Sequence, residues 1–174
     1  MRYKLIFPIT IGLSDGIITA LMLVAGDILR GDHIYLGLAF RVAYGSSFVG
    51  TFSYFIAQYS ELRGELSRTS RQLNLRSPTY LIKSKLGRDI IFESVAGAAS
   101  AGFFGFVGAL IPLVTSVMLP SDPIVAIASA EASLAVLGFG IGKSVKGNYF
   151  FWIIMMFIIG IVVAWAGDFL YLVR

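Results

Sequence analysis

Long apolar stretches separated by polar segments dominate the chain. The stretches are unbroken rather than alternating, which predicts helices and argues against the strands of a membrane barrel. Each is long enough to cross about 30 Å of hydrocarbon at about 1.5 Å per helical residue. We therefore predict an all-α, integral membrane, single-domain bundle of five transmembrane helices. The predicted spans are 5–28, 34–59, 90–119, 124–141 and 149–173, with a cytoplasmic segment at 60–89.

Lysine and arginine residues outside the spans are divided unequally between the two sides of the membrane. Arg30 and Arg174 lie on one side. The other side holds eleven: Arg2, Lys4, Arg63, Arg68, Arg71, Arg76, Lys83, Lys85, Arg88, Lys143 and Lys146. Because basic loops stay in the cytoplasm, this asymmetry predicts the N-terminus inside and the C-terminus outside. An even number of spans would mix the two groups.

The composition of the chain excludes several kinds of functional site. The 174 residues are 57% hydrophobic and only 14% charged, against about a quarter charged in soluble domains. There is no cysteine, so disulfides, thiolate metal sites and cysteine nucleophiles are excluded, and the single histidine, His33, cannot form a His-rich site. We find no motif of an enzyme. The basic loop is explained by topology, so we expect no nucleic-acid partner.

Small residues recur four positions apart, as in Gly12-xxx-Gly16 and Ala101-xxx-Gly105. Such spacing lets helix backbones approach closely in lipid, and it predicts close helix packing. Beyond the second span, Glu61 and Glu65 are also four apart. We therefore expect that helix to continue into the cytoplasm with both glutamates on one face. Residues 80–87 form a short amphipathic stretch suited to the membrane surface.

A few ionisable residues fall inside the predicted spans, where each costs at least a few kcal/mol and needs a partner or a role. Asp15, on the Gly12-xxx-Gly16 face, lies near the membrane midplane and could hold a cation or serve as a hydrogen-bonded structural residue. Glu131 lies at similar depth and could move protons or pair with Arg41. Glu93 and Asp168 lie near span ends, where solvation explains them.

Three segments resemble the vacuolar iron transporter (VIT) family. Residues 11–26 contain Ser14-Asp15-Gly16 and then an apolar run ending in glycine, like the first helix of that family. Residues 50–59 resemble the second helix. Residues 98–113, ending in Gly108-Ala-Leu-Ile-Pro-Leu113, are similar to the third. The resemblance extends over nearly the whole chain.

The resemblance implies a homodimer of five-helix subunits that moves Fe²⁺ or Mn²⁺ out of the cytosol, coupled to protons, with Asp15 as a metal carboxylate. Ser46 and Tyr54 stand where eukaryotic members place a glutamate and a methionine. Gln58 stands within Ala57-Gln58-Tyr59, where many prokaryotic members have Gly-Glu-Tyr. Glu61 and Glu65 are what remains of the family's cytoplasmic metal-binding module.

We thus expect a multi-pass protein of a prokaryotic plasma membrane, with lipids and divalent metal ions as partners and no permanently bound cofactor. The metal ion is cargo. The metal residues are Asp15, Glu61 and Glu65, and the pathway or proton-transfer residues are Ser46, Tyr54, Gln58 and Glu131. The alternative is a bundle that has lost transport and serves as an accessory or structural subunit of a membrane complex.

Overall fold

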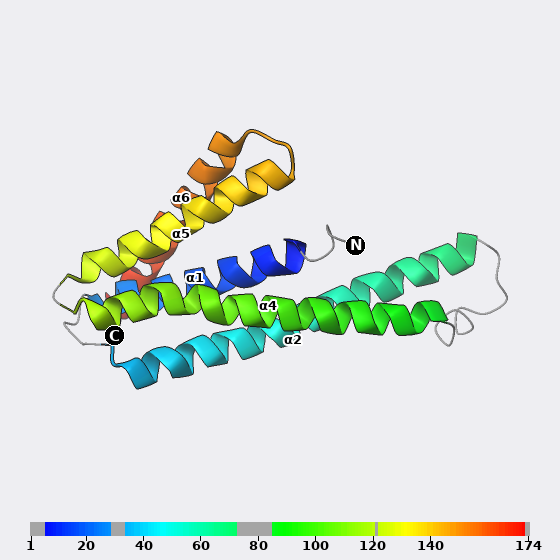
Figure 1. Cartoon of the computed structure of the whole chain (residues 1–174), viewed down its shortest axis with the longest axis horizontal. Helices are drawn as coiled ribbons and strands as arrows, with labels where there is room; N and C mark the ends of the chain where they lie inside the picture. The colour runs from blue at the N-terminus through cyan, green and yellow to red at the C-terminus, as the bar shows by residue number, and fades with distance from the viewer. Residues whose placement is uncertain (1–5, 29–33, 73–84, 121, 173–174) are drawn as a thin grey trace.

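The structure, a computed structural model, describes residues 6–28, 34–72, 85–120 and 122–172. This part of the chain is all-helical (Figure 1), which confirms the predicted fold class. Its helices are α1 (Ile6–Ile28), α2 (Leu36–Gln72), α4 (Lys85–Met118), α5 (Pro123–Ser144) and α6 (Tyr149–Leu172).

Four of these helices are long and apolar enough to cross a membrane. Their apolar segments are Ile6–Gly26, Gly87–Met118, Ile124–Ser144 and Tyr149–Phe169, in α1, α4, α5 and α6. The helix with the predicted second span, α2, is less apolar because Arg41 and several serines and glycines interrupt its first half. It continues through Glu61 and Glu65 to Gln72, as predicted. Most of the amphipathic stretch 80–87 lies outside the described residues.

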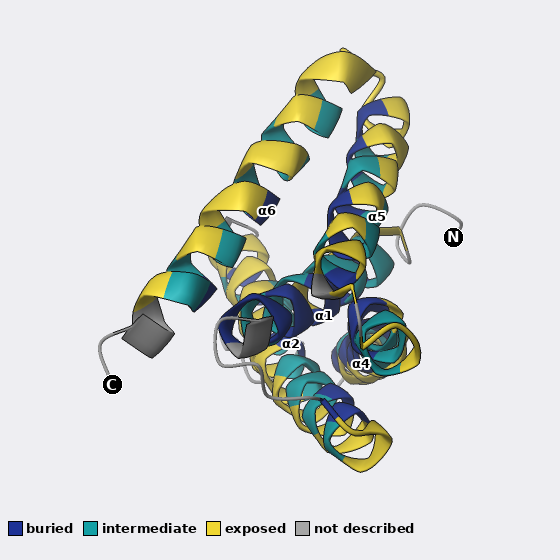
Figure 2. Cartoon of the chain, turned by 90° about the vertical axis from the view of Figure 1, so that its left-hand side faces the viewer, coloured by how far each residue is buried: buried dark blue, intermediate teal, exposed yellow. Residues whose placement is uncertain are grey.

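Helix α1 lies at the centre of the bundle and contacts α2, α4, α5 and α6 (Figure 2). Its glycines allow the close packing. A methyl group on Gly12 would collide with the carbonyl oxygen of Ala101 on α4, and one on Gly16 would collide with that of Gly105. The predicted close packing of these two small-residue stripes is confirmed, and the partners belong to the same chain. In lipid, such backbone contact supplies the packing energy that a hydrophobic effect would supply in water.

Helices α2 and α4 pack side by side and are the longest of the described helices. Their 37 and 34 residues correspond to about 55 and 51 Å, well beyond the hydrocarbon thickness of about 30 Å. Figure 1 shows the C-terminal end of α2 and the N-terminal end of α4 projecting together past the other helices. Within the bundle, the Ser47 hydroxyl donates a hydrogen bond to the carbonyl oxygen of Gly102, at 2.6 Å.

Helices α5 and α6 form an antiparallel hairpin. Near its turn, methyl groups on Gly138 and Gly142 would lie 2.6 Å from the Trp152 carbonyl oxygen and 2.7 Å from the Tyr149 Cα, so the two backbones nearly touch. The turn includes Lys146, whose φ of 52° is the left-handed conformation. At the other end of α6, Gly167 packs against the Met22 carbonyl of α1. The outer face of α6 is exposed along much of its length (Figure 2), as suits a lipid-facing helix.

Candidate functional site

Asp15 lies near the middle of the apolar segment of α1, and its side chain is directed toward α2. A methyl group on Gly50 would lie 2.9 Å from Asp15 Oδ2. This corrects the expectation that Asp15 lies on the Gly12-xxx-Gly16 face, since that face is filled by α4. Adjacent residues of a helix point about 100° apart, so Asp15 cannot share the direction of Gly16. In the single chain the Asp15 side chain is exposed.

The side of α2 that meets Asp15 carries several of the predicted site residues. Ser46, Gly50, Tyr54 and Gln58 follow one another at intervals of four and therefore lie along one face of the helix. We call these four residues the α2 stripe. They span about 18 Å along the helix axis, with Gly50 opposite Asp15. The structure therefore brings Ser46, Tyr54 and Gln58 onto the face that Asp15 approaches.

Tyr54 is the buried residue of the α2 stripe. Its ring packs against Gly97 of α4, where an added methyl group would lie 2.8 Å from Tyr54 Cε1. On the other side it contacts the ring of Phe7 of α1, with 6.5 Å between centroids. The Tyr54 hydroxyl donates a hydrogen bond to Gln58 Oε1 at 3.3 Å. Three helices thus hold this phenol in place, at the level where α1 begins.

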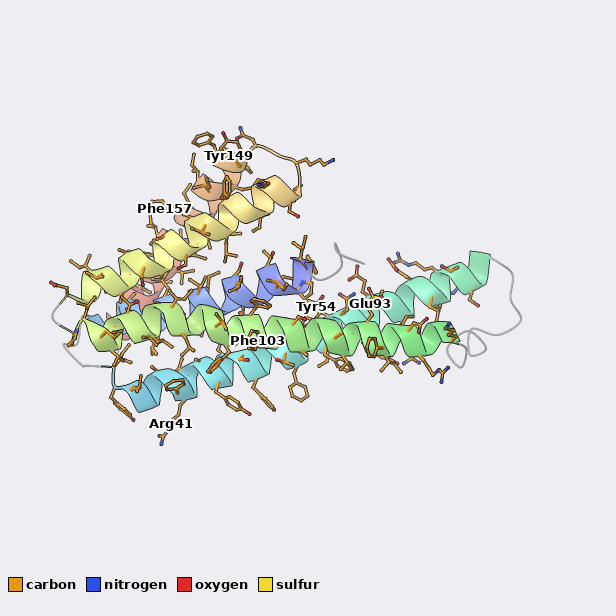
Figure 3. All side chains as sticks on the ribbon, viewed as in Figure 1. Arg41, Tyr54, Glu93, Phe103, Tyr149 and Phe157 are labelled. Carbon is orange, nitrogen blue, oxygen red and sulfur yellow. The ribbon has the colours of Figure 1, made fainter. Side chains whose placement is uncertain are left out.

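Two glutamates lie in the neighbourhood of Tyr54. Glu93 on α4 and Glu61 on α2 are both near enough for their charges to act on the phenol. Figure 3 shows Tyr54 and Glu93 close together where α2 and α4 leave the other helices. Glu93 is half-buried, whereas its place near a span end predicts only a solvated carboxylate. Its position one turn before Gly97 puts it on the face of α4 that meets Tyr54, but the contact between Gly97 and Tyr54 is not evident from the sequence.

Glu61 and Glu65 lie on the exposed surface of α2 beyond the bundle. They are one helical turn apart and share a face, as predicted. Glu61 stands near Tyr54, and Glu65 lies one turn farther out along the helix. The exposed pair therefore lies next to the end of the α2 stripe that contains Tyr54 and Gln58.

The structure does not bring Arg41 and Glu131 together. Arg41 is exposed on α2 and points away from the bundle (Figure 3). Glu131 is buried on α5, with its carboxyl group packed against Gly160 of α6. Helices α2 and α5 make no contact with each other in the described ranges. The expected ion pair is thus replaced by two separate groups, because α1 and α4 lie between their helices.

Two further observations concern the chemistry and the relatives of this site. Within the described ranges, no group of three or more histidine, cysteine, aspartate or glutamate residues is placed to hold a metal ion. The oxygen atoms of Asp15, Tyr54, Gln58, Glu61 and Glu93 are of the hard type that suits divalent cations such as Mn²⁺. The chain matches no protein-family model and no curated protein sequence.

Proposed function

We propose that this chain is a VIT-like transporter that moves a divalent metal cation, Fe²⁺ or Mn²⁺, out of the cytosol in exchange for protons. The observation that carries the proposal is Asp15, a carboxylate in the middle of an apolar helix that faces a glycine on α2. An ionisable residue at that depth costs about 3 kcal/mol on insertion scales. A cation or a proton bound to the carboxylate offsets this cost, so both ligands compete for one site.

The α2 stripe supplies a route to this carboxylate. In this proposal Glu61 and Glu65 attract cations at the exposed end of α2, and the oxygen atoms of Glu61, Glu93, Tyr54 and Gln58 are the next ligands, at the edge of the bundle. Gly50 lies one helical turn from Tyr54, and its lack of a side chain lets the Asp15 carboxylate lie against the α2 backbone. The route therefore presents oxygen donors at successive levels, as stepwise movement of a cation requires.

We propose that α2 is the fifth transmembrane helix and that the N-terminus is cytoplasmic. Exposed apolar side chains follow one face of α2 at intervals of four: Phe40, Tyr44, Phe48, Phe52 and Ile56. This face is about 24 Å long, close to the thickness of the hydrocarbon core. With five spans, the basic residues of the described extension, Arg63, Arg68, Arg71, Lys85 and Arg88, fall on the cytoplasmic side. The proposed location is the plasma membrane of a prokaryote.

The proposed working form is a homodimer. A carboxylate left exposed to lipid at mid-membrane depth is unfavourable, and Asp15 is exposed in the single chain. A second copy placed over α1 and α2 would cover Asp15 and bring two such carboxylates together. Their mutual repulsion favours binding of M²⁺ or of a proton, which gives an exchange mechanism: the metal displaces protons at shared carboxylates.

The test is metal flux in proteoliposomes with Fe²⁺, Mn²⁺, Co²⁺ and Zn²⁺ across an imposed pH gradient. Asp15→Asn keeps the shape of the side chain and removes its charge, so flux should fall at least about tenfold while folding and dimerisation persist. Asp122→Asn is the matched control, because Asp122 is exposed before α5. If the wild-type protein moves none of these metals, the transporter proposal fails and an accessory subunit of a membrane complex takes its place.

A further inference from the structure

Glu131 is a buried carboxyl group that the proposed route does not use. It lies on α5 at the level of Gly160 on α6, and a methyl group on Gly160 would collide with both carboxyl oxygens. The residue is 8% exposed. Neither Oε1 nor Oε2 has a hydrogen-bond partner in the described part of the chain. Gly160 therefore leaves the space that the carboxyl group occupies.

The surroundings of this carboxyl group are apolar on three helices. The residues before and one turn after it on α5, Ala130 and Leu134, belong to a buried cluster with Ile17 and Leu21 of α1. Met156, Val163 and Ala164 of α6 pack against the same cluster. The two serines of α5 nearest to Glu131, Ser129 and Ser133, donate their hydroxyl groups to carbonyl oxygens of their own helix. Among the residues that the structure describes, the junction of α1, α5 and α6 thus offers the carboxyl group no hydrogen-bond partner.

No cation among the described side chains compensates a charge at this position. Helices α1, α4 and α6 pack on α5, and Asp15 on α1 is directed to Gly50 on its opposite side. Glu93 lies beside Tyr54, and Asp168 lies two turns beyond Gly160 on α6. The charged or titratable residues of these three helices are Asp15 and Asp27 on α1, Lys85, Arg88, Asp89 and Glu93 on α4, and Tyr149, Asp168 and Tyr171 on α6. Lys143 is in the last turn of α5 itself, three turns from Glu131.

We propose that Glu131 is a proton-binding site: its carboxyl group is un-ionised in this packing, and it releases the proton only when α5 and α6 part at Gly160. An unpartnered carboxylate in apolar surroundings is strongly unfavourable, whereas the neutral acid is tolerated. Release breaks the O–H bond and transfers the proton to water that enters between the two helices, leaving a carboxylate that this water solvates. In the proposed transporter, Glu131 couples helix movement to protons, a role that rests on the proposed function.

The site can be tested without any transport measurement. Infrared spectra of the whole protein in lipid at neutral pH should contain a carbonyl stretch of an un-ionised carboxylic acid that is absent in Glu131→Gln. Asp168→Asn and Asp15→Asn should retain that band. If the wild-type and Glu131→Gln spectra agree in this region at neutral pH, Glu131 is ionised and the proposal is wrong. If the wild-type protein shows this band but moves no metal ion, only the proposed function is overturned.

The movement can be tested with spin labels, since the chain has no native cysteine. Ala128→Cys on α5 and Val162→Cys on α6 are both exposed and lie at the same end of the hairpin as Glu131. As the pH rises, the distance between the two labels should lengthen or broaden with Glu131 present and should stay constant with Glu131→Gln. An equal response in both proteins, or none in either, would overturn the coupling of proton release to the parting of α5 and α6.

Discussion

Asp15 of α1 and Gly50 of α2 face each other, with room for no more than the glycine hydrogen between the carboxylate and the α2 backbone. A methyl group at Gly50 would lie 2.9 Å from Asp15 Oδ2. At this distance the carboxylate would have to move. The glycine therefore fixes the position of the carboxylate relative to the α2 stripe, and this relationship can be tested separately from the charge.

The first prediction concerns this glycine. Gly50→Ala should weaken the apparent affinity for Mn²⁺ by roughly tenfold, since small displacements of a ligand group have effects of this size. Stability should not fall, because alanine in a helix is favoured over glycine by about 0.5–1 kcal/mol. Gly45→Ala is the matched control: it lies on α2 with no neighbouring atom within 4 Å. Equal affinity in the two variants, measured by flux against metal concentration, would separate Gly50 from the binding of the cation.

The second prediction concerns the packing of α1 on α4. A methyl group on Gly16 would collide with the Gly105 carbonyl and lie 2.9 Å from the Ala109 nitrogen. These are backbone atoms that cannot turn aside. Gly16→Ala should therefore lower the free energy of unfolding by about 1–3 kcal/mol, the usual cost of overpacking. Gly64→Ala on α2, with open space around it, should leave the melting temperature in detergent unchanged or raise it.

The small-residue stripes show what the sequence predicts well. Gly12, Gly16, Ala101 and Gly105 could be assigned to close helix contacts because their spacing of four repeats on two helices. The sequence does not predict that the stripes of α1 and α4 contact each other within one chain. The direction of Asp15 was wrong for the same reason: which face of α1 points to α2 depends on how the helices are arranged.

Depth in the membrane is not sufficient to predict which ionisable residues contact each other. Arg41 and Glu131 were considered as a pair because they lie at compatible depths, but depth contains no information about position within the membrane plane. The structure separates α2 from α5. Glu93 was not predicted as a site residue, because its position near a span end indicates solvation. The sequence does not show that Tyr54 lies near it.

The third prediction concerns the Tyr54 hydroxyl, which donates to Gln58 Oε1 at 3.3 Å. Tyr54→Phe keeps the ring against Gly97 and Phe7 and removes the hydrogen bond, so stability should fall by no more than about 1 kcal/mol. Metal flux should fall several-fold if the phenol lines the route. Tyr59→Phe is the control, because the Tyr59 ring stacks on Phe55 away from the α2 stripe and its substitution should leave flux unchanged.

The fourth prediction concerns topology. Single cysteines at Thr69 and Asp122, both exposed, should be labelled by an impermeant reagent from opposite sides of the membrane. Thr69 is preferable to its neighbour Ser70, which is only 1% exposed. Lys146→Cys, in the α5–α6 turn, should be labelled from the same side as Thr69→Cys. Labelling of Thr69→Cys and Asp122→Cys from one side would rule out the five-span arrangement.

The last prediction concerns the contact between Glu131 and Gly160. Gly160→Ala places a methyl group into the space of the carboxyl group, so it should destabilise the protein by about 1–3 kcal/mol. With Glu131→Ala as background the same methyl group has room. The effects of the two substitutions should therefore be non-additive, with a coupling energy of about 0.5–3 kcal/mol, as for residues in direct contact. The measurement is the melting temperature of all four proteins of the cycle in one detergent at neutral pH.

Gly140→Ala is the control for this cycle, since Gly140 lies on α5 with no atom of another residue near its missing side chain. Combined with Glu131→Ala it should show simple additivity. Sites in contact couple, whereas sites without shared partners add within about 0.3–0.5 kcal/mol. Additive effects of Gly160→Ala and Glu131→Ala would mean that the carboxyl group does not occupy the space left by Gly160. Glu131 would then have access to polar surroundings, and the apolar burial that makes it a proton-binding site would be refuted together with the contact.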